Sequence, residues 1–417
     1  MEKLKKEDAH PKILQALLNT EVEMIKDDVL DNEMILNMGP QHPATHGVLR
    51  LMLRLDGETV LASVPELGYL HRGYEKMAEN MNYLDYIPHT DRLDYLAPPA
   101  NNVSYILAVE KLAGIEAPPR AQYIRMMMCE LARIASHMVA IGSLGLDIGA
   151  VTVFLWTLRE REKVLDLFDK ICGARFTTSY TRIGGVAQDV DDATLSLVRD
   201  FINQYEEKLD EIERLLNGNR IFLERLEGIG VISYDDAIDI GLTGPSLRGS
   251  GVKYDLRKNA PYLFYPEIDF NIPVFTEGDS LARYFVRVEE TRESAKIITQ
   301  VIDKMPKGEV MLNSPKKVLP KKVEIYSRME ELIHDFMLVN FGMNPPEGQI
   351  YSATENPKGE LGFYIVSKGE GHPWKMKIRS PSMVNLQSLP GLVKGHMVSD
   401  VVAIIGSLDP VMGEADK

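Results

Sequence analysis

Residues 118–149 read PPRAQYIRMMMCELARIASHMVAIGSLGLDIG, and this stretch predicts the strongest helix of the chain. The two leading prolines can open a helix, because the first helical turn needs no backbone N–H donor. Apolar side chains then recur at spacings of three and four and make one stripe, which is typical of a helix packed on a core. Arg125, Arg133 and His137 lie off this stripe. The stripe itself consists of Ile124, Met127, Met128, Leu131, Ile134, Ala135, Met138 and Ile141.

The glycine-rich run 142–149 is expected to break this helix, and a second long helix is predicted from about Val151 to Ile171. Asp147 therefore sits in a glycine-flanked break between two apolar helices. Two interpretations of its carboxylate stay open. It caps the second helix, or it faces a buried polar site, where it needs a cation or a hydrogen-bond donor.

Residues 39–47, GPQHPATHG, form a stiff turn that carries two histidines. Pro40 and Pro43 fix φ and lack N–H donors, so His42 and His46 cannot share a helix face. The run that follows the turn, together with the dipeptide Asp56-Gly57 and residues 59–62, predicts a β-hairpin. A rigid turn beside strands can aim imidazoles at a small molecule. Alternatively, both rings bond only to the backbone of the loop.

Composition restricts the classes of function. The chain has 417 residues, of which 45% are hydrophobic and 26% charged, and its net charge of −14 argues against nucleic acid as a partner. No apolar run approaches the ~20 residues of a membrane-spanning helix, and the first residues lack a signal-peptide core. We therefore expect a cytoplasmic protein, with contact to a membrane protein still open. Cys129 and Cys172 are too few for an iron–sulfur cluster, so we expect any redox cofactor on another chain.

The remaining segments are predicted from periodicity and turn residues. Residues 1–33 are expected to form a surface arm with one short helix. Residues 228–275 are expected to form a long ordered loop that packs against a partner. The apolar C-terminal segment should be buried. Helices are predicted at 101–112, 189–216, 279–305 and 325–341, and a hairpin at 348–378.

Six motifs resemble, in order, those of the quinone-site subunit of proton-pumping NADH:quinone oxidoreductase, respiratory complex I. The resemblance runs from about residue 34 to residue 417. The motifs are GPQHPATHG at 39–47, GYLHRG at 68–73, DRLDY at 91–95, LDIGA at 146–150, RERE at 159–162 and SLDPVMG at 407–413.

The resemblance implies a helix-rich α+β fold similar to the large subunit of nickel–iron hydrogenases. It also implies one domain over 34–417, made of a hairpin with the site loop (34–66), a helical core (98–305), and a hairpin with a buried tail (348–417). Hydrogenases hold their metals through two Cys-x-x-Cys pairs. The matching positions here are Asp94, Ala97, Val411 and Glu414, so the metal site is expected to be lost.

The resemblance also implies roles for single residues. His46 and Tyr95 match the donors to the two quinone carbonyls, and Asp147 matches the carboxylate paired with that histidine. Imidazole and phenol can each supply one of the two protons that a reduced quinone takes up. The other implied positions are His42, Asp409 and Val411 around the headgroup, and Arg92 and Arg182 near the cluster of a partner.

The implied activity is two-electron reduction and protonation of quinone, coupled to proton translocation, by a subunit that is inactive alone. The chain itself would bind no metal and no cofactor. Its substrate would be menaquinone or ubiquinone, and electrons would come from an iron–sulfur cluster in an adjacent subunit. Further partners would be other peripheral-arm subunits and a membrane-arm subunit at the quinone entrance. The complex would place the chain at the cytoplasmic side of the cell membrane, as a peripheral protein.

Three other interpretations compete with this one. A ferredoxin-fed complex shares the same subunit, and this chain does not separate the two forms. A non-catalytic hydrogenase-like scaffold would not need His46, Tyr95 and Asp147 together. A metal-dependent hydrogenase lacks its cysteines here. One departure from the family is that many members carry a histidine at the position of Thr177 or Thr178. We therefore expect a lower, less pH-dependent cluster potential, which suits menaquinone.

Overall fold

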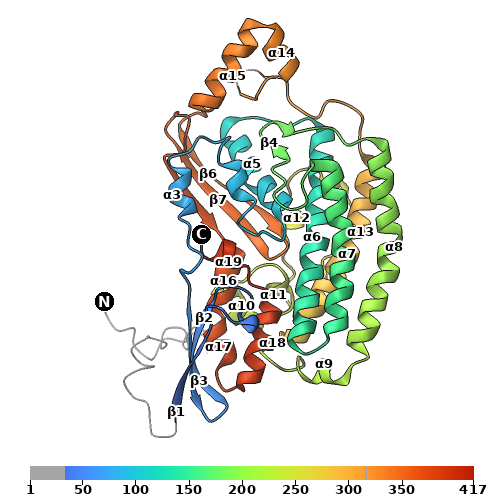
Figure 1. Ribbon diagram of the computed structural model, residues 1–417, viewed down its shortest axis with the longest axis vertical. Coiled ribbons are helices and arrows are strands. Elements are labelled where there is room, and N and C mark those ends of the chain that lie inside the picture. Colours follow the sequence, from blue (N-terminus) through green and yellow to red (C-terminus); the bar gives the residue numbers. More distant parts are fainter. Residues whose placement is uncertain (1–32, 315–316) are drawn as a thin grey trace.

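The computed structural model describes residues 33–314 and 317–417. The fold is α+β: long helices pack side by side on one side of the molecule, and the two three-stranded antiparallel sheets lie on the opposite side (Figure 1). The arm predicted for residues 1–33, with its short helix, falls outside the described residues except for Glu33. No helix in the described part of the chain is both long and apolar enough to cross a membrane.

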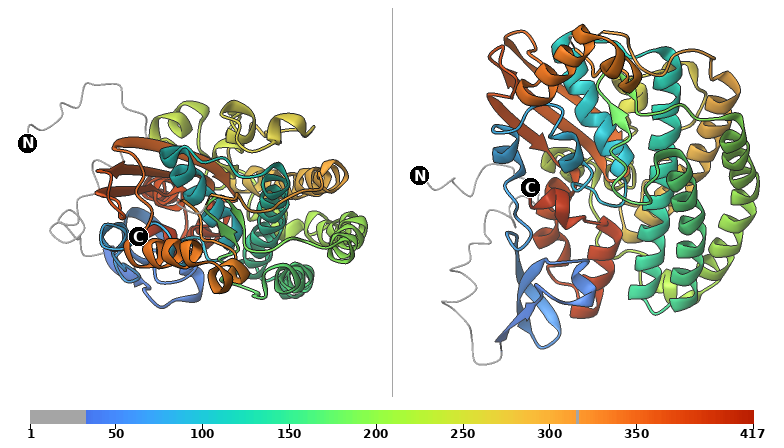
Figure 2. Two further views of the ribbon diagram at one scale, coloured as in Figure 1. Left: turned by 90° about the horizontal axis from the view of Figure 1, so that it is seen from above. Right: turned by 45° about the horizontal axis from the view of Figure 1, so that its top comes forward.

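Four long helices form a bundle along one side of the molecule, visible in both views of Figure 2. They are α6 (Pro119–Asp147), α7 (Val151–Cys172), α8 (Asp192–Asn217) and α13 (Ser280–Lys304). The N-caps of α8 and α13 are aspartates, Asp191 and Asp279, whose carboxylates accept from backbone N–H groups of the first turn. The predicted helices 189–216 and 279–305 are thereby confirmed to within a few residues.

Helix α6 does not end at the glycine run, so that prediction is wrong. It continues through Gly142 and Gly145 to Asp147, and the chain breaks only at residues 148–150. A Cβ on Gly142 would lie 2.2 Å from Thr157 Oγ1, and one on Gly145 would lie 3.5 Å from Val153 Cγ1. The glycines therefore let α6 and α7 approach closely and do not terminate the helix.

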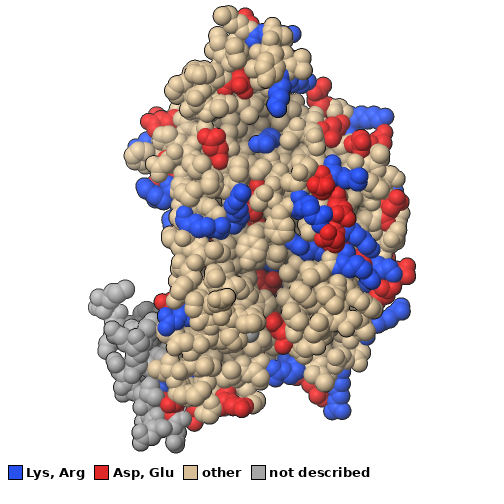
Figure 3. Space-filling model, in the orientation of Figure 1, with Lys and Arg blue, Asp and Glu red and all other residues tan. Residues whose placement is uncertain are grey.

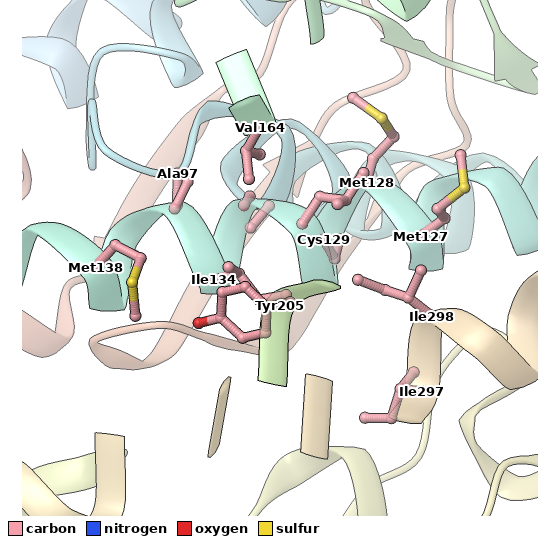
Figure 4. Close-up of a cluster of buried hydrophobic side chains, with 14 of the residues drawn as sticks. Ala97, Met127, Met128, Cys129, Ile134, Met138, Val164, Tyr205, Ile297 and Ile298 are labelled. Atoms are coloured by element: carbon pink, nitrogen blue, oxygen red, sulfur yellow. The ribbon is translucent and has the colours of Figure 1, made fainter. Parts of the chain in front are cut away.

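Helix α6 is buried on every side, not only along its apolar stripe. Met127, Met128 and Met138 fill the core as expected, and Met127 lies beside Ile298 of α13 (Figure 4). The three residues off the stripe are also buried, because the side chain of each pairs with a carboxylate inside the protein. They are Arg125 with Glu110, Arg133 with Glu130, and His137 with Glu290.

The N-terminal sheet has three antiparallel strands in the order β1–β2–β3. These are β1 (Glu33–Met38), β2 (Arg50–Asp56) and β3 (Thr59–Glu66). The predicted hairpin is confirmed and gains β1 as an edge strand. The loop 39–47 connects β1 to β2 and contains a short 3-10 turn, η1 (Pro43–Thr45). One face of the sheet is buried against the C-terminal helices α17 and α18.

The predicted hairpin at 348–378 is confirmed and becomes a three-stranded sheet. Its strands are β6 (Gly348–Asn356), β7 (Gly359–Ser367) and β8 (Lys375–Arg379). The chain then forms α16 (Pro381–Gln387), α17 (Leu389–Val393), α18 (Val398–Leu408) and α19 (Met412–Ala415). Helices α18 and α19 are buried, as expected for the apolar C-terminal segment.

The region 228–275 is ordered by this chain itself, so the expectation that it packs against a partner is wrong for its central part. Residues 242–250 are all buried, and Arg248 donates to Glu290 and Glu355 at 2.7 and 2.8 Å. Three short α-helices lie in this region: α10 (Tyr234–Ile240), α11 (Pro245–Arg248) and α12 (Leu256–Asn259).

The predicted helix at 325–341 is split at Arg328 into α14 (Lys322–Ser327) and α15 (Met329–Phe341). The pair projects from the top of the molecule in Figure 1. The remaining elements are α3 (Tyr74–Ala78), α4 (Ile87–Thr90), α5 (Pro98–Ala113), β4 (Thr181–Arg182), β5 (Gly185–Val186), α9 (Arg220–Glu224) and η2 (Tyr265–Glu267).

Candidate functional site

The imidazole of His46 meets the carboxylate of Asp147 where the N-terminal loop touches the end of α6. His46 Nε2 lies 2.7 Å from Asp147 Oδ2, and the two side chains are 11% and 12% exposed. With Asp147 ionised, the Nε2–H group is the donor. The N-cap of α7 is Ala150 and receives no side-chain hydrogen bond. The buried polar interpretation of Asp147 is therefore confirmed, and the capping interpretation is wrong.

The loop that carries His46 is held by its own turn and by α18. Thr45 is fully buried, and its Oγ1 and N both donate to the carbonyl of His42, at 2.9 and 3.1 Å. His46 then adopts a left-handed conformation with φ 50°. Helix α18 backs onto the pair, since a Cβ on Gly406 would lie 2.8 Å from Asp147 Oδ2 and 3.6 Å from His46 Nε2.

Tyr95 reaches the same region from the loop between α4 and α5. A Cβ on Gly413 would lie 3.1 Å from Tyr95 Cδ1, and a Cβ on Gly47 would lie 3.1 Å from Met412 Cγ. The dipeptide Met412-Gly413 therefore bridges the histidine loop and the tyrosine. Burial raises the pKa of Tyr95, and the nearby carboxyls of Asp94 and Asp409 add to this shift. The phenol is thus a proton donor at neutral pH.

Asp409 and Val411 lie between α18 and α19, on either side of Pro410. Asp409 is buried, contacts the ammonium group of Lys358, and lies 3.9 Å from Arg287 Nε. Val411 is also buried, and its N–H donates to Ser382 Oγ at 3.1 Å. The side chains of Asp409 and Val411 are therefore buried inside the protein, behind the dipeptide Met412-Gly413.

The other predicted positions are spread more widely. His42 is exposed and pairs through its backbone with Gly47, so it shares the turn of His46. Arg92 is exposed beside Tyr95, and its carbonyl accepts from Arg72 Nη2 at 2.9 Å. Arg182 lies apart on β4, near the start of α6 (Figure 1).

Sequence reasoning missed three residues that complete the site. Arg72 ties the loop after β3 to the carbonyls of Arg92 and Gly413. Lys358 is buried in the β6–β7 turn as the partner of Asp409. Ser382 binds Glu414 through its N–H and its hydroxyl. Only Arg72 had a local signal, since it lies in the GYLHRG motif. The other two come close to Asp409 and Glu414 only through the fold.

The turn between α6 and α7 surrounds Asp147 with exposed apolar side chains. Leu146, Val151 and Leu155 are 40%, 53% and 60% exposed. The face shown in Figure 3 carries few charges over the lower ends of α6 and α7, whereas both signs gather over their upper parts and α8. The site thus pairs two proton donors with an apolar surface, which suits an apolar molecule that accepts protons at polar atoms.

Comparison with known proteins agrees with this chemistry. A family model described as "Respiratory-chain NADH dehydrogenase, 49 Kd subunit" matches residues 147–417. The chain is 60% identical to an NADH-quinone oxidoreductase subunit of Chloroherpeton thalassium, over 94% of this chain and 89% of that relative. It is 54% identical to the corresponding subunit of Salinibacter ruber, over 94% and 87%. It is 56% identical to that of Methylacidiphilum infernorum, over 92% of each. The chain therefore belongs to the family of the 49 kDa subunit of respiratory-chain NADH dehydrogenase.

Proposed function

We propose that this chain forms the quinone headgroup site of a proton-translocating NADH:quinone oxidoreductase. The observation that carries the proposal is the 2.7 Å contact between His46 and Asp147 at the edge of an apolar surface, with Tyr95 brought close by Met412-Gly413. Relatives named as NADH-quinone oxidoreductase subunits, aligned over nearly the whole chain, support the assignment.

The chemistry needs two protons for each quinone that takes up two electrons. In this proposal Tyr95 donates one proton from its hydroxyl, and His46 donates the other from its protonated ring. Asp147 orients the imidazole and stabilises its positive charge, because a charge-assisted hydrogen bond is about twice as strong as a neutral one. His42 shapes the headgroup end from the same turn, and Asp409 and Val411 support the wall from behind.

The electrons come from outside this chain. Cys129 and Cys172 are free, and two thiols are fewer than the about four ligands that an iron–sulfur cluster needs. We place the terminal iron–sulfur cluster in an adjacent subunit that covers the exposed Arg92, and Arg182 would also face that partner. Other peripheral-arm subunits and a membrane-arm subunit complete the enzyme, at the cytoplasmic side of the membrane.

A hydrogenase-like origin is part of the same proposal. Asp94, Ala97, Val411 and Glu414, which stand where hydrogenases carry cysteines, are all buried. Asp94 and Glu414 lie close enough for the charge of one to raise the pKa of the other. Within the described residues, no group of three or more His, Cys, Asp or Glu side chains is arranged to hold a metal. We infer that the ancestral metal pocket became the pocket of the quinone.

Replacement of Tyr95 by Phe tests the proposal in membranes that contain the assembled complex. Removal of one hydroxyl should abolish most NADH:quinone activity and leave NADH:ferricyanide activity intact, since the latter does not use the quinone site. Tyr69→Phe is the matched control, because Tyr69 is 46% exposed on a nearby loop. Full quinone activity in the Tyr95→Phe complex would contradict the proposal and favour a scaffold role.

A further inference from the structure

Three carboxyl groups and one ammonium group are buried directly behind Tyr95. Asp94 and Glu414 are 0% exposed, Asp409 is 4% exposed and Lys358 is 3% exposed. They come from the loop before α5, from α19, from the end of α18 and from the β6–β7 turn. Proton donation by Tyr95 leaves a phenolate, which must be reprotonated before the next turnover. A proton source close to Tyr95 is therefore needed.

The hydrogen bonds of Glu414 show which of its oxygens is available. Oε1 accepts from the N–H of Ser382 at 3.1 Å and also from the Ser382 hydroxyl. That hydroxyl in turn accepts from Val411 N–H, so its single proton is committed to Glu414. Oε2 is buried without a hydrogen-bond partner among the described residues. A proton on this carboxyl therefore sits on Oε2.

Asp94 shows the complementary pattern. Its Oδ1 accepts from Leu96 N–H at 3.0 Å, while its Oδ2 is buried without a partner among the described residues. A buried acceptor without a donor costs about 1–3 kcal/mol. Two such oxygens in one cluster are more stable if one carries a proton and the other accepts it, directly or through a water molecule.

The charge balance of the cluster also calls for one proton. Lys358 contacts Asp409, and Arg287 Nε lies 3.9 Å from the same carboxylate. Two buried cations thus face the three carboxyls of Asp94, Asp409 and Glu414. Because an uncompensated buried charge is costly, one carboxyl should stay neutral. Burial raises the pKa of both Asp94 and Glu414, the latter to about 8, and the charge of Asp94 adds to the shift of Glu414, so the proton belongs to this pair.

The cluster lies within electrostatic reach of the phenol. Asp94 directly precedes Tyr95 in the chain, and Glu414 directly follows Gly413. A Cβ on Gly413 would lie 2.5 Å from Leu93 O and 3.1 Å from Tyr95 Cδ1. The charges of Asp94, Asp409 and Glu414 each raise the pKa of Tyr95. A charge change in the cluster is therefore felt at the hydroxyl.

We propose that Glu414 and Asp94 hold one proton between them and return it to Tyr95 after the phenol has protonated the quinone. This rests on the proposed function of Tyr95. The Tyr95 O–H bond breaks as an O–H bond forms on the quinone oxygen. The phenolate then takes a proton from the carboxyl pair, and the pair recovers a proton from water. No electrons move in this step. Glu414 and Asp94 act through Tyr95 and are positioning residues.

Other charged and titratable groups around Glu414 also influence how tightly the carboxyl pair holds its proton. Arg72 approaches from the loop after β3, where its Nη2 lies 3.4 Å from the Gly413 carbonyl. Lys417, at the end of the chain, interacts electrostatically with Glu414. Helix α16, which packs against α19, contributes Ser382 and carries no charged side chain. The facing groups are thus Asp94, Tyr95, Asp409, Lys358, Arg287, Arg72 and Lys417.

The test compares Glu414→Gln with the wild-type complex across pH. In the wild type, NADH:quinone activity should fall as pH rises through about 8, because the stored proton is lost. Glutamine keeps the Oε1 acceptor for Ser382 but cannot pass a proton on. We expect quinone reduction to drop roughly 10²-fold and this fall with pH to vanish. Glu414→Asp should restore both the rate and the pH dependence in part.

Controls separate this proposal from the function on which it rests. Asp400→Asn is the matched carboxyl-to-amide change, since Asp400 is also buried and pairs with Arg225 at the first turn of α18. It should keep the wild-type pH profile. NADH:ferricyanide activity reports assembly, and if Glu414→Gln does not assemble, the same comparison is made with Asp94→Asn. A wild-type profile in the assembled variant overturns the proton store. Full activity in Tyr95→Phe overturns the function itself.

Discussion

Replacement of Gly406 by Ala would disturb the His46–Asp147 pair without touching either residue. The new Cβ would lie 2.8 Å from Asp147 Oδ2, 3.1 Å from Leu144 Cδ1 and 3.6 Å from His46 Nε2. Favourable non-bonded contacts between heavy atoms begin at roughly 3.5 Å. Either the carboxylate or α18 must therefore move by roughly half an ångström, and the carboxylate is the lighter and freer of the two.

The size of the effect follows from two opposing contributions. Alanine in a helix is about 1 kcal/mol more favourable than glycine, and overpacking costs about 1–3 kcal/mol. The net cost to folding is therefore small, and the complex should assemble. A displacement of about 1 Å in a reacting group can cost about 10²-fold in rate. We expect about half that displacement and about a tenfold loss of quinone reduction, which equals about 1.4 kcal/mol.

The assay is NADH:quinone activity in membranes, with NADH:ferricyanide activity as the measure of assembly. Gly145→Ala is the matched control, because Gly145 lies on α6 two residues before Asp147. Its Cβ would lie 3.5 Å from Val153 Cγ1, an ordinary contact. We expect Gly145→Ala to keep wild-type quinone reduction. Equal quinone activity in the two variants would refute the reasoning, because the position of the pair would then not matter to the reaction.

Three further predictions concern other parts of the chain. Arg125→Met should destabilise the fold by about 3–5 kcal/mol, since Arg125 is fully buried and donates to both carboxylate oxygens of Glu110 at 2.7 and 2.9 Å. The yield of assembled complex should fall, and the second change Glu110→Gln should recover part of that yield. Gly413→Ala would place a Cβ 2.5 Å from Leu93 O and 3.1 Å from Tyr95 Cδ1, so quinone reduction should fall while ferricyanide reduction persists. The iron–sulfur cluster that we propose in an adjacent subunit should titrate at a low potential with a shallow pH slope, because Thr178 and its neighbour offer no imidazole. A steep slope near neutrality in a redox titration would contradict this.

Local sequence patterns predicted the structure correctly where it depends on residues close together in the chain. The three-and-four spacing predicted α6 and α7, because a helix displays its apolar face in the sequence itself. Asp56-Gly57 predicted the turn between β2 and β3, since both residues suit a tight hairpin. The six ordered motifs indicated the family, which the relatives confirm. These features depend on residues close together in the chain.

Other features were decided by neighbours distant in the sequence. Glycine can end a helix or admit another helix, and only the packing of α7 on Gly142 shows which applies here. The sequence allowed Asp147 to cap α7, whereas the structure pairs it with His46, which lies 101 residues away in the chain. The long loop 228–275 shows no period in the sequence, and it is held by contacts with distant elements: its Arg248 side chain donates to Glu290 of α13 and Glu355 of β6.

The sequence by itself therefore determined the long bundle helices, the hairpins and the family, since propensity, periodicity and motif are properties of short stretches. The tertiary structure alone decided which charged groups are buried and with whom they pair. Glu414 illustrates the reason. Its residue type predicts an exposed carboxylate, but the fold encloses it with Asp94 and Ser382, so burial raises its pKa to about 8. Burial and charge pairing depend on the sum of all surrounding segments, and no single stretch contains that information.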